Sequence, residues 1–535
     1  MTELLTAAQM RAIEQAAIAS GEVTGLELME RAGRGVVEAV FEEWTELAEG
    51  AHRAVVLCGP GNNGGDGFVV ARLLKEVGWE VEVFLYGDAQ KLPSDAKANY
   101  ERWVDMGEVA ALGTIKRDYY HNAELIIDAF FGTGLSRPLE SECLIPLRDA
   151  RINNDEPNGP LIVAVDVPSG LCADSGRTIK LPDDHGLYPF AHLTVAFHGF
   201  KNGHYMARGA RHCGKLVLVD IGLPSIERRW VRGKGFQPPN GSASLLSPDN
   251  RRFRRNQRGL KKIGLDTHKY SHGHALIQSG GVGKGGAARL AARGALRVGA
   301  GAVTLGCPPA ALIENAAQLN AIMLRAVKGV DGVDNILEDD RINALCMGPG
   351  MGVSDESRGL VEVGLQSGRG LVLDADALTL IGHDAPLFGL LHKECVLTPH
   401  AGEFARLFPD VAEKLAAPAT KGPAYSKVDA TREAAKRAGC VVLFKGPDTV
   451  IADPSGRCSI NGSVYERSAP WLATAGSGDV LAGFITGLLA RGFAPMQAAE
   501  TGAWLHTECA LSFGPGLIAE DLPEELPKVF RALGI

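Results

Sequence analysis

The sequence lacks several features that would place it outside the ordinary cytoplasmic enzymes. No apolar run approaches the ~18 residues that a membrane-spanning helix needs, and the opening MTELLTAAQMRAIEQ lacks the apolar core of a signal peptide. The ten cysteines include no C-x-x-C pair, which indicates reduced thiols packed in cores. No segment repeats with a period of about 20–50 residues, which argues against a solenoid. We therefore expect a cytoplasmic enzyme that does not bind a membrane.

The whole chain has fewer basic than acidic residues, 55 against 63. The formal net charge is -8, which argues against nucleic acid as the main partner. The composition, 45% hydrophobic and 22% charged, is typical of a folded globular protein. At 535 residues the chain is too long for one ordinary core, so we expect two or three domains.

Two series of alternating helical and strand patterns are present. In the first, helical patterns cover 7–20 and 26–47, and short apolar runs such as RAVVLC, ELIID and LIVAVD follow. The second starts at HALIQSGG and contains runs such as GLVLDADAL and GCVVLFKG. Strands that alternate with helices predict an α/β fold with mainly parallel, doubly wound sheets. The predicted organisation is a first domain at 1–225, a linker at 226–264 and a second domain at 265–535.

The linker is predicted from its prolines and from the run RRFRRNQRGLKK at 251–262, which holds seven basic residues in twelve. This run is either a patch for nucleic acid or an acidic partner, or a solvated connector. The acidic composition of the whole chain favours the connector.

Three strand ends of the first domain carry polar side chains. The first strand is followed by Asn62, Asn63 and Asp66, the second ends at Asp128, and the third ends at Asp166 with Ser169 close behind. Ligands of open parallel sheets bind at such strand ends. Carboxylates and amides there can hold a hard cation or act as an acid and a base. The alternative is that each Asp only caps the next helix.

Four motifs in this order resemble the N-terminal YjeF domain, the NAD(P)HX epimerase family: LMERAGRGV, GPGNNGGDGFVVARLL, DAFFGTGLSRP and AVDVPSGL. The resemblance covers about 5–225 and implies a Rossmann-like fold that interconverts the R and S epimers of hydrated NADH and NADPH. It implies a potassium ion on Asn63, Asp128 and Ser169, and proton transfer by Asp166. The residues that it places on the hydrated nucleotide are Asn62, Asn63, Gly64, Gly65, Asp66, Gly132, Thr133, Gly134, Leu135, Ser136, Arg137, Pro138 and Asp166.

The stretch ATAGSGD at 473–479 resembles the anion-hole signature of ribokinase-like kinases. Backbone N–H groups at the start of the following helix would face a transferring phosphoryl group. Asp479 then stands where a base takes a proton from a hydroxyl group. Lys445, in the turn of LFKGPDTVI, is placed to meet a nucleotide phosphate, although a lone lysine in a turn is usually solvated. His272 and His274 lack a third metal ligand and are interpreted as structural.

Together with GAARLAARGALRVGAG, GPGMG, LDADAL and TPHAGEFARL, these motifs are similar to the C-terminal YjeF domain, the ADP-dependent NAD(P)HX dehydratase. This resemblance covers about 265–533 and implies a ribokinase-like α/β/α fold. It places Lys445, Gly446, Pro447, Asp448, Thr449 and Gly478 on the adenine nucleotide. It places Ala287, Gly350, His400 and Asp479 on the hydrated cofactor. The segment THKYSHGHA departs from the family pattern by lacking the glycine after Lys269.

The two resemblances imply a bifunctional enzyme that repairs NADHX and NADPHX, with K⁺ in the epimerase domain and ADP or ATP with Mg²⁺ in the dehydratase domain. We also expect a homo-oligomer. One alternative is a ribokinase-like small-molecule kinase with an N-terminal regulatory domain. Another makes the first domain a binding module without catalytic activity.

Overall fold

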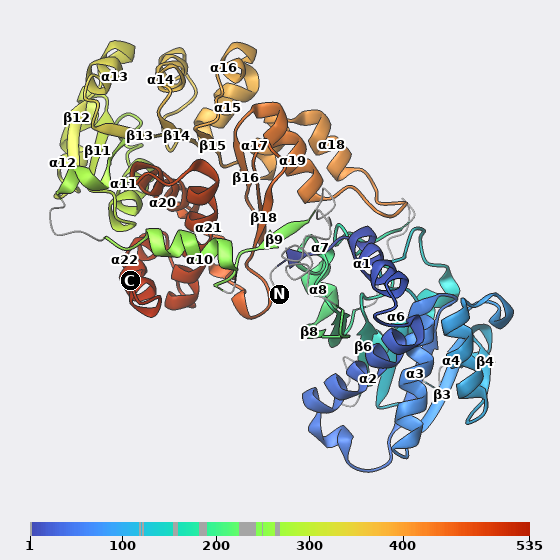
Figure 1. Cartoon of the computed structure of the whole chain (residues 1–535). Helices are drawn as coiled ribbons and strands as arrows, with labels where there is room; N and C mark the ends of the chain where they lie inside the picture. Colours follow the sequence, from blue (N-terminus) through green and yellow to red (C-terminus); the bar gives the residue numbers. More distant parts are fainter. Residues whose placement is uncertain are drawn as a thin grey trace. The chain divides into compact units, whose positions relative to one another are not determined.

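The computed structural model describes residues 3–116, 119, 122–153, 159–180, 190–223, 242–248, 250–262 and 268–535 (Figure 1). The described chain divides into two units. The N-terminal unit comprises 3–242 together with 417–426, and the C-terminal unit comprises 243–416 and 427–535. The predicted boundary at 225 and the predicted linker residues 226–241, 249, 263 and 264 lie outside the described residues.

The N-terminal unit is built around a parallel sheet with the order β4-β3-β2-β5-β6-β7-β8. The strands of this sheet are β2 (Arg53–Cys58), β3 (Glu80–Leu85), β4 (Val109–Ala111), β5 (Leu125–Ala129), β6 (Leu161–Val165), β7 (Leu193–Phe197) and β8 (Lys215–Val219). The unit also contains β1 (Glu3–Leu4), which is not part of this sheet. Its α-helices are α1 (Ala7–Ala19), α2 (Gly25–Glu43), α3 (Asn62–Glu76), α4 (Ser94–Val104), α6 (Ser141–Asn153), α7 (Asn202–Tyr205) and α8 (Gly209–Cys213).

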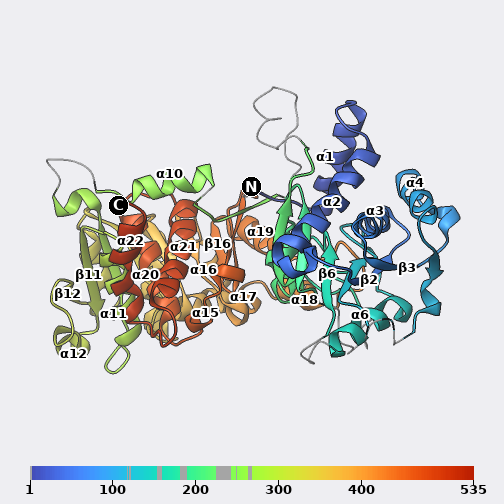
Figure 2. The ribbon, with the colours of Figure 1, turned by 90° about the horizontal axis from the view of Figure 1, so that it is seen from below.

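Side chains that alternate along each strand bury both faces of this sheet. Ala54 and Val56 of β2 pack with α2, α3 and α4, whereas Val55 and Leu57 pack with Cys143 of α6. Figure 2 shows α3 on one side of β2 and β6 and α6 on the other. The prediction of a doubly wound parallel sheet from continuous apolar runs is therefore confirmed for this unit.

The C-terminal unit contains a mainly parallel sheet in the order β9-β18-β17-β16-β15-β14-β13-β10-β11-β12. Only the β16–β17 and β17–β18 pairs are antiparallel among its described neighbours. The strands are β9 (Ala243–Leu245), β10 (His274–Gln278), β11 (Ala302–Cys307), β12 (Met323–Ala326), β13 (Ile342–Met347), β14 (Gly370–Leu373), β15 (Cys395–Leu397), β16 (Val441–Phe444), β17 (Asp448–Ala452) and β18 (Cys458–Gly462).

Helices cover both faces of this second sheet as well. They are α10 (Arg251–Gly259), α11 (Gly286–Arg297), α12 (Leu312–Ala316), α13 (Gly329–Leu337), α14 (Asp355–Gln366), α15 (Ala375–His383), α16 (Ala385–Gly389), α17 (Ala401–Leu407), α18 (Pro409–Ala416), α19 (Lys427–Ala438), α20 (Ser477–Ala490), α21 (Pro495–Phe513) and α22 (Asp521–Ala532). One core cluster joins α11, α20 and α21 to the sheet, whereas on the other face Phe404 of α17 stacks on Phe444 of β16 with ring centroids 4.1 Å apart. The α/β/α prediction is confirmed.

Part of the predicted linker is ordered structure instead. β9 pairs with β18, and α10 belongs to the C-terminal unit, where Phe253 packs on Trp504 at 5.2 Å between ring centroids. The basic run concealed this helix because Phe253, Asn256 and Leu260 turn inward at helical spacing while the arginines between them stay outside. These residues are neither a free connector nor a loop.

Two global expectations can be compared with the structure. All ten cysteines are buried thiols, as the scattered cysteines predicted. Within the described residues, no helix combines the length and the apolar character needed to cross a membrane.

Candidate active sites

The polar strand ends of the N-terminal unit meet where its strand order reverses. The strands β3 and β4 are added on one side of β2, and the later strands β5 to β8 are added on its other side. The strand order therefore reverses between β2 and β5. The predicted site residues follow β2, β5 and β6, which are neighbours in the sheet. Ligands of doubly wound folds bind at this position.

Gly132 is the point at which the three strand ends approach each other. A Cβ atom at this glycine would lie 2.7 Å from Oδ1 of Asn63 and 3.4 Å from Oδ2 of Asp166. Asn63 starts α3 after β2, Gly132 follows β5, and Asp166 follows β6. The structure therefore brings together three residues that the sequence could only place separately, and glycine leaves the space between them open.

Asp128 and Ser169 form a second, fully buried pair. The Ser169 hydroxyl donates to Oδ1 of Asp128 at 2.6 Å, and the Ser169 N–H donates to Oδ2 at 2.8 Å. The backbone N–H of Phe131 donates to the Ser169 hydroxyl at 3.0 Å. Burial raises the pKa of Asp128 to about 6, against the opposing effect of these hydrogen bonds.

The oxygen atoms of this cluster fit a hard cation. Carboxylate, hydroxyl and amide oxygens are the donors that such cations prefer. Nδ2 of Asn63 is buried without a hydrogen-bond partner among the described residues. This NH2 group can therefore donate to a ligand oxygen while the amide oxygen faces the cation, and the buried Asp128 carboxylate would gain a counter-charge.

Asp166 forms an ion pair that the sequence analysis missed. Lys201, whose side chain is 0% exposed, pairs through Nζ with Oδ1 of Asp166 and also donates to the Phe197 carbonyl oxygen at 3.2 Å. Nε2 of His204 lies 3.0 Å from the Asp166 carbonyl oxygen. Asp166 has a φ of 65°, a left-handed conformation that non-glycine residues rarely adopt. The only sequence signal for Lys201 is its position shortly after β7, the strand that follows β6 in the chain.

Two further carboxyl groups face this pair. Burial raises the pKa of Asp66 well above its usual range, and Asp166 and Glu14 add to the effect. Burial also raises the pKa of Glu14 to about 7, with Asp166 acting in the same direction and Lys201 opposing it. Glu14 lies on α1, before the first recognised motif, and sequence reasoning gave no reason to select it.

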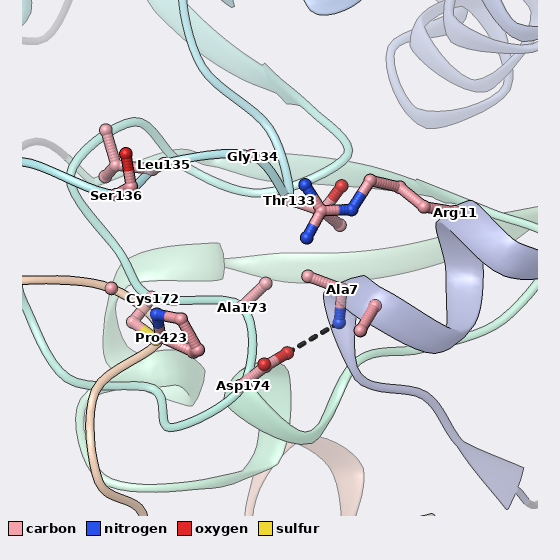
Figure 3. Close-up of a pocket in the computed structure, with 12 residues that line it drawn as sticks. Ala7, Arg11, Thr133, Gly134, Leu135, Ser136, Cys172, Ala173, Asp174 and Pro423 are labelled. Carbon is pink, nitrogen blue, oxygen red and sulfur yellow. Dashed lines mark hydrogen bonds between the residues drawn. The ribbon is translucent and has the colours of Figure 1, made fainter. Parts of the chain in front are cut away.

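A cavity of about 190 Å³ adjoins the loop after β5 (Figure 3). Thr133, Gly134, Leu135 and Ser136 line it, all of them predicted to contact the hydrated nucleotide. The rest of the lining is made of Ala7, Ala8, Arg11, Cys172, Ala173, Asp174, Gly422 and Pro423. Figure 3 shows Arg11 reaching from α1 toward Thr133. Since whole ligands usually occupy ~300–1,000 Å³, this cavity suits one part of a larger ligand.

The remaining predicted residues of this unit lie around the cluster in different environments. Asn62 is exposed at the start of α3, and Gly64 and Gly65 are buried. A Cβ at Gly65 would meet Ala96 at 3.0 Å, which explains the need for glycine by helix packing. Arg137 is exposed and lies 3.9 Å from Glu140, and the neighbouring Pro138 is half-buried.

In the C-terminal unit, the predicted anion hole is the first turn of α20. Gly476 caps the helix with a left-handed φ of 86°, and Ser477, Gly478 and Asp479 form its first turn. The unpaired N–H groups of a helix N-terminus favour an anion. A Cβ at Gly478 would lie 3.5 Å from Nζ of Lys445, so this lysine and the helix start face the same space.

Lys445 is held by carboxylates on two other strand ends. Its Nζ lies 2.8 Å from Oδ1 of Asp374, which follows β14, and 3.8 Å from Oε2 of Glu403 in α17. Burial alone would lower the pKa of Lys445, but Asp374 and Glu403 keep it above the ordinary value. The lysine is therefore a fixed positive charge beside the helix start. Asp374 stands in the quoted motif LDADAL, but its role was not predicted.

Asp479 shares this acidic environment. Burial raises its pKa to about 7, and Asp374 raises it further while Lys445 opposes the shift. A carboxylate with a pKa near neutrality is suited to take a proton from a hydroxyl group. The arrangement of Asp479, Lys445 and the α20 N-terminus can support phosphoryl transfer to a hydroxyl.

The other predicted nucleotide residues form the turn between β16 and β17. The Thr449 hydroxyl donates to the Gly446 carbonyl oxygen at 2.7 Å, and Gly446 has a φ of 155°. Asp448 is 2.7 Å from Nζ of Lys427, and the same Nζ donates to the Lys445 carbonyl oxygen at 3.1 Å. Pro447 completes the turn, which is therefore fixed by its own contacts and by Lys427.

The residues predicted to contact the hydrated cofactor fall in two places. The Cβ position of Gly350 is 3.6 Å from Cβ of Ala287, so the loop after β13 touches the first turn of α11. Next to them, the Gly352 N–H donates to Asp376 at 2.7 Å, and Asp376 also raises the pKa of Asp479. His400 instead caps α17: its Nδ1 accepts from the Gly402 N–H at 3.0 Å, and its side chain is 56% exposed.

These observations define a two-unit α/β enzyme in which a doubly wound unit with a buried Asp–Lys pair is joined to an α/β/α unit where Lys445 and Asp479 meet at the start of a long helix. Residues 25–203 match the family model described as YjeF-related protein N-terminus. Residues 275–528 match the model described as NAD(P)H-hydrate dehydratase.

Relatives extend over nearly the full chain. A bifunctional NAD(P)H-hydrate repair enzyme from Moorella thermoacetica is 34% identical, covering 99% of this chain and 97% of the relative. An NAD(P)H-hydrate epimerase from Roseobacter litoralis is 47% identical over 42% of this chain and all of its own length. A solved ADP/ATP-dependent NAD(P)H-hydrate dehydratase from Bacillus subtilis is 26% identical, with a TM-score of 0.43 over 52% of this chain and 97% of that structure. The chain belongs to the family of bifunctional NAD(P)H-hydrate repair enzymes.

Proposed function

We propose that the two units repair hydrated nicotinamide nucleotides in sequence. The N-terminal unit interconverts the R and S epimers of NADHX and NADPHX, and the C-terminal unit dehydrates the S epimer to NADH or NADPH. The observation that carries this division is that the first turn of α20 carries the carboxylate of Asp479 with Lys445 fixed beside it, whereas the first turn of α3 carries no acidic residue. The N-terminal site has carboxyl groups and a buried lysine suited to moving protons.

Dehydration faces the difficulty that hydroxide is a poor leaving group. Asp479 takes the proton of the ring hydroxyl, and the oxygen attacks the terminal phosphoryl group of the nucleotide. The phosphoryl group is transferred to the ring oxygen, and AMP is released when the co-substrate is ADP. The ring nitrogen then expels phosphate, and the loss of a proton from the adjacent carbon restores the dihydronicotinamide. Lys445 and the N–H groups at Gly478 stabilise the charge that develops on the phosphoryl oxygens.

The adenine nucleotide binds on the 445–449 turn and against Gly478 in this proposal, with ADP as the preferred co-substrate. Among the described residues, no group of three His, Cys, Asp or Glu side chains is placed to hold a metal ion. Mg²⁺ would bind mainly through the nucleotide phosphates, as this ion commonly does. Ala287 and Gly350 supply the close surface for the hydrated cofactor, and His400 contributes from the exposed end of α17.

Epimerisation requires the C–O bond next to the ring nitrogen to break and to form again on the opposite face. Asp166 and Lys201 lie together and can give a proton to the departing hydroxyl and take one from the incoming water. Asn63, Gly132 and Asp66 surround this pair on the side of β2 and β5. Arg11, beside the cavity, is suited to a phosphate group of the dinucleotide.

Asn63, Asp128 and Ser169 would hold K⁺ in this unit. The ion would supply positive charge next to the buried Asp128 carboxylate. Ser169 orients Asp128 through its two hydrogen bonds to that carboxylate. The homo-oligomeric state and the cytoplasmic location stay predictions.

The deciding experiment supplies a mixture of R and S hydrates to the full chain, with and without ADP, and follows each species by chromatography. We expect the epimers to equilibrate without ADP and both to disappear as NADH absorbance returns with ADP. A stable phosphorylated product would instead indicate a ribokinase-like kinase. Failure to equilibrate the epimers would make the N-terminal unit a binding module.

A further inference from the structure

A segment from the second half of the sequence belongs to the N-terminal unit. Residues 417–426 lie between α18 and α19, which are part of the C-terminal unit, yet the segment itself packs within the N-terminal unit. We call residues 417–426 the inserted segment. The sequence around it, AAPATKGPAYSK, carries none of the recognised motifs.

The inserted segment is fixed by backbone hydrogen bonds. The Gly422 N–H donates to the Ser136 carbonyl oxygen at 3.1 Å, and the Lys180 N–H donates to the Ala419 carbonyl oxygen at 2.9 Å. From outside the cavity, the Arg177 guanidinium donates to the carbonyl oxygens of Tyr425, at 3.2 Å, and Ala417. Hydrogen bonds along the length of the segment therefore fix the path of its backbone.

Apolar contacts bury two alanines of the segment. Ala419 and Ala424 share a core cluster with Leu135, Leu139, Cys172 and Ile179. Gly422 is buried, and a Cβ there would overlap the Leu135 carbonyl oxygen and lie 2.8 Å from Cδ1 of Ile179. Only glycine permits this approach to the backbone of the 132–138 loop.

The same segment forms a wall of the cavity. Gly422 and Pro423 line it together with Thr133, Gly134, Leu135 and Ser136 (Figure 3). The segment thus touches the candidate substrate loop twice, through the hydrogen bond to Ser136 and through the contact at Leu135.

We propose that the inserted segment is a positioning element of the epimerase site, which holds the 132–138 loop in the conformation that binds the hydrated nucleotide and closes one side of its pocket. This inference rests on the proposed function of the N-terminal unit. Gly422 is its central positioning residue, and Arg177 anchors the segment without lining the cavity. The segment acts on substrate binding rather than on the proton transfer at Asp166.

The test uses the full chain with pure R hydrate, no ADP, and chromatographic measurement of the S hydrate. We expect Gly422→Ala to raise the KM for epimerisation roughly tenfold to a hundredfold, because displacing a positioning loop by about 1 Å has effects of this size. The kcat should change less than twofold. Arg177→Ala should raise the KM in the same direction by about threefold, and Arg177→Lys should restore part of the loss.

Matched controls separate positioning from a general loss of structure. Gly389→Ala adds a Cβ where nothing lies within 4 Å, and Arg437→Ala removes an exposed arginine that pairs with Asp410. Both controls should leave the KM for epimerisation unchanged. Dehydration of pure S hydrate with ADP should stay at the unsubstituted level in all five variants.

The outcomes separate this inference from the proposed function. If the unsubstituted chain does not interconvert the epimers, the proposed function fails. If it does, and Gly422→Ala and Arg177→Ala keep its KM, the inference is wrong. The inference is also wrong if these variants show a lower kcat for epimerisation and slower dehydration together with the raised KM, since that pattern indicates a purely structural role. If Gly422→Ala does not fold, Arg177→Ala against Arg177→Lys decides on the same criteria.

Discussion

The two candidate sites use the same pair of chemical groups for different purposes. In the N-terminal unit Lys201 is completely buried against Asp166, whereas in the C-terminal unit Lys445 is 20% exposed beside Asp374. Lys445 lies beside Gly478 in the first turn of α20, which also carries Asp479, whereas the first turn of α3 near Asp166 carries no acidic residue. The comparison teaches that the Asp–Lys pair alone does not distinguish the proton transfer proposed for one site from the phosphoryl transfer proposed for the other, and that the residues around each pair carry the distinction.

The strongest test of this comparison is Asp479→Asn. The amide cannot take the proton of the ring hydroxyl, so we expect dehydration to fall by about 10³–10⁴-fold. Epimerisation should be unchanged, because Asp479 belongs to the other unit. Both rates are measured on the same preparation, with ADP for NADH absorbance and without ADP for the epimer ratio. An equal loss of both would contradict the assignment of two separate sites.

Asp166→Ala should produce the opposite result. It removes the acceptor of Lys201 and the candidate proton carrier, and we expect epimerisation to slow by about 10²–10³-fold. The variant should still dehydrate S hydrate with ADP but leave R hydrate behind. Chromatography of a mixed sample after complete consumption of the S form measures this directly. Rapid consumption of both forms would mean that Asp166 does not transfer the proton.

The different burial of the two lysines predicts different costs in stability. Lys201→Met leaves the Asp166 carboxylate unpaired in a buried site, which should lower the free energy of unfolding of the N-terminal unit by about 3–5 kcal/mol. Lys445→Met should cost less, because water reaches the partly exposed site. Denaturant unfolding of both variants, followed by a signal for each unit, measures the difference. Equal costs would mean that burial does not distinguish the pairs.

The smallest expected effect concerns pH. Asp479 must be deprotonated to act as a base, and its pKa is raised to about 7, first by burial and then by Asp374. Below pH 7, kcat/KM for dehydration should therefore fall about tenfold per unit. Replacing Asp374 by Asn removes a neighbouring negative charge and should move this decline to lower pH. A flat profile from pH 5 to 8 would exclude Asp479 as the base.

Much of the fold was predictable because apolar runs and helical spacing are local. The runs RAVVLC, ELIID and LIVAV became β2, β5 and β6. The short β4 and β12 were missed because their residues, VAA and MLRA, include at most one β-branched side chain and do not form an apolar run like those of the other strands. The helix α10 was missed because arginines dominate its composition and its buried residues are few.

The site was predictable only as a set of strand ends. Asn63, Asp128, Asp166 and Asp479 were selected because they follow strands or precede a glycine-rich helix. Glu14 and Lys427 were not selected, because nothing in the residues around them distinguishes an active-site carboxylate or lysine from a solvated one. Asp374 stands in the motif LDADAL after a predicted strand, but it was given no role. Their partners are distant in the sequence, and only the packed sheet shows the pairing.

The sequence by itself determined two α/β units, the glycine-rich loops and the identity of the candidate acids, because each depends on neighbouring residues along the chain. Only the tertiary structure decided that Lys201 neutralises Asp166, that Lys445 stands beside the α20 N-terminus, and that residues 417–426 complete a pocket of the N-terminal unit. These contacts join residues far apart in the chain, and their free energy comes from burial and hydrogen bonding that no local pattern encodes.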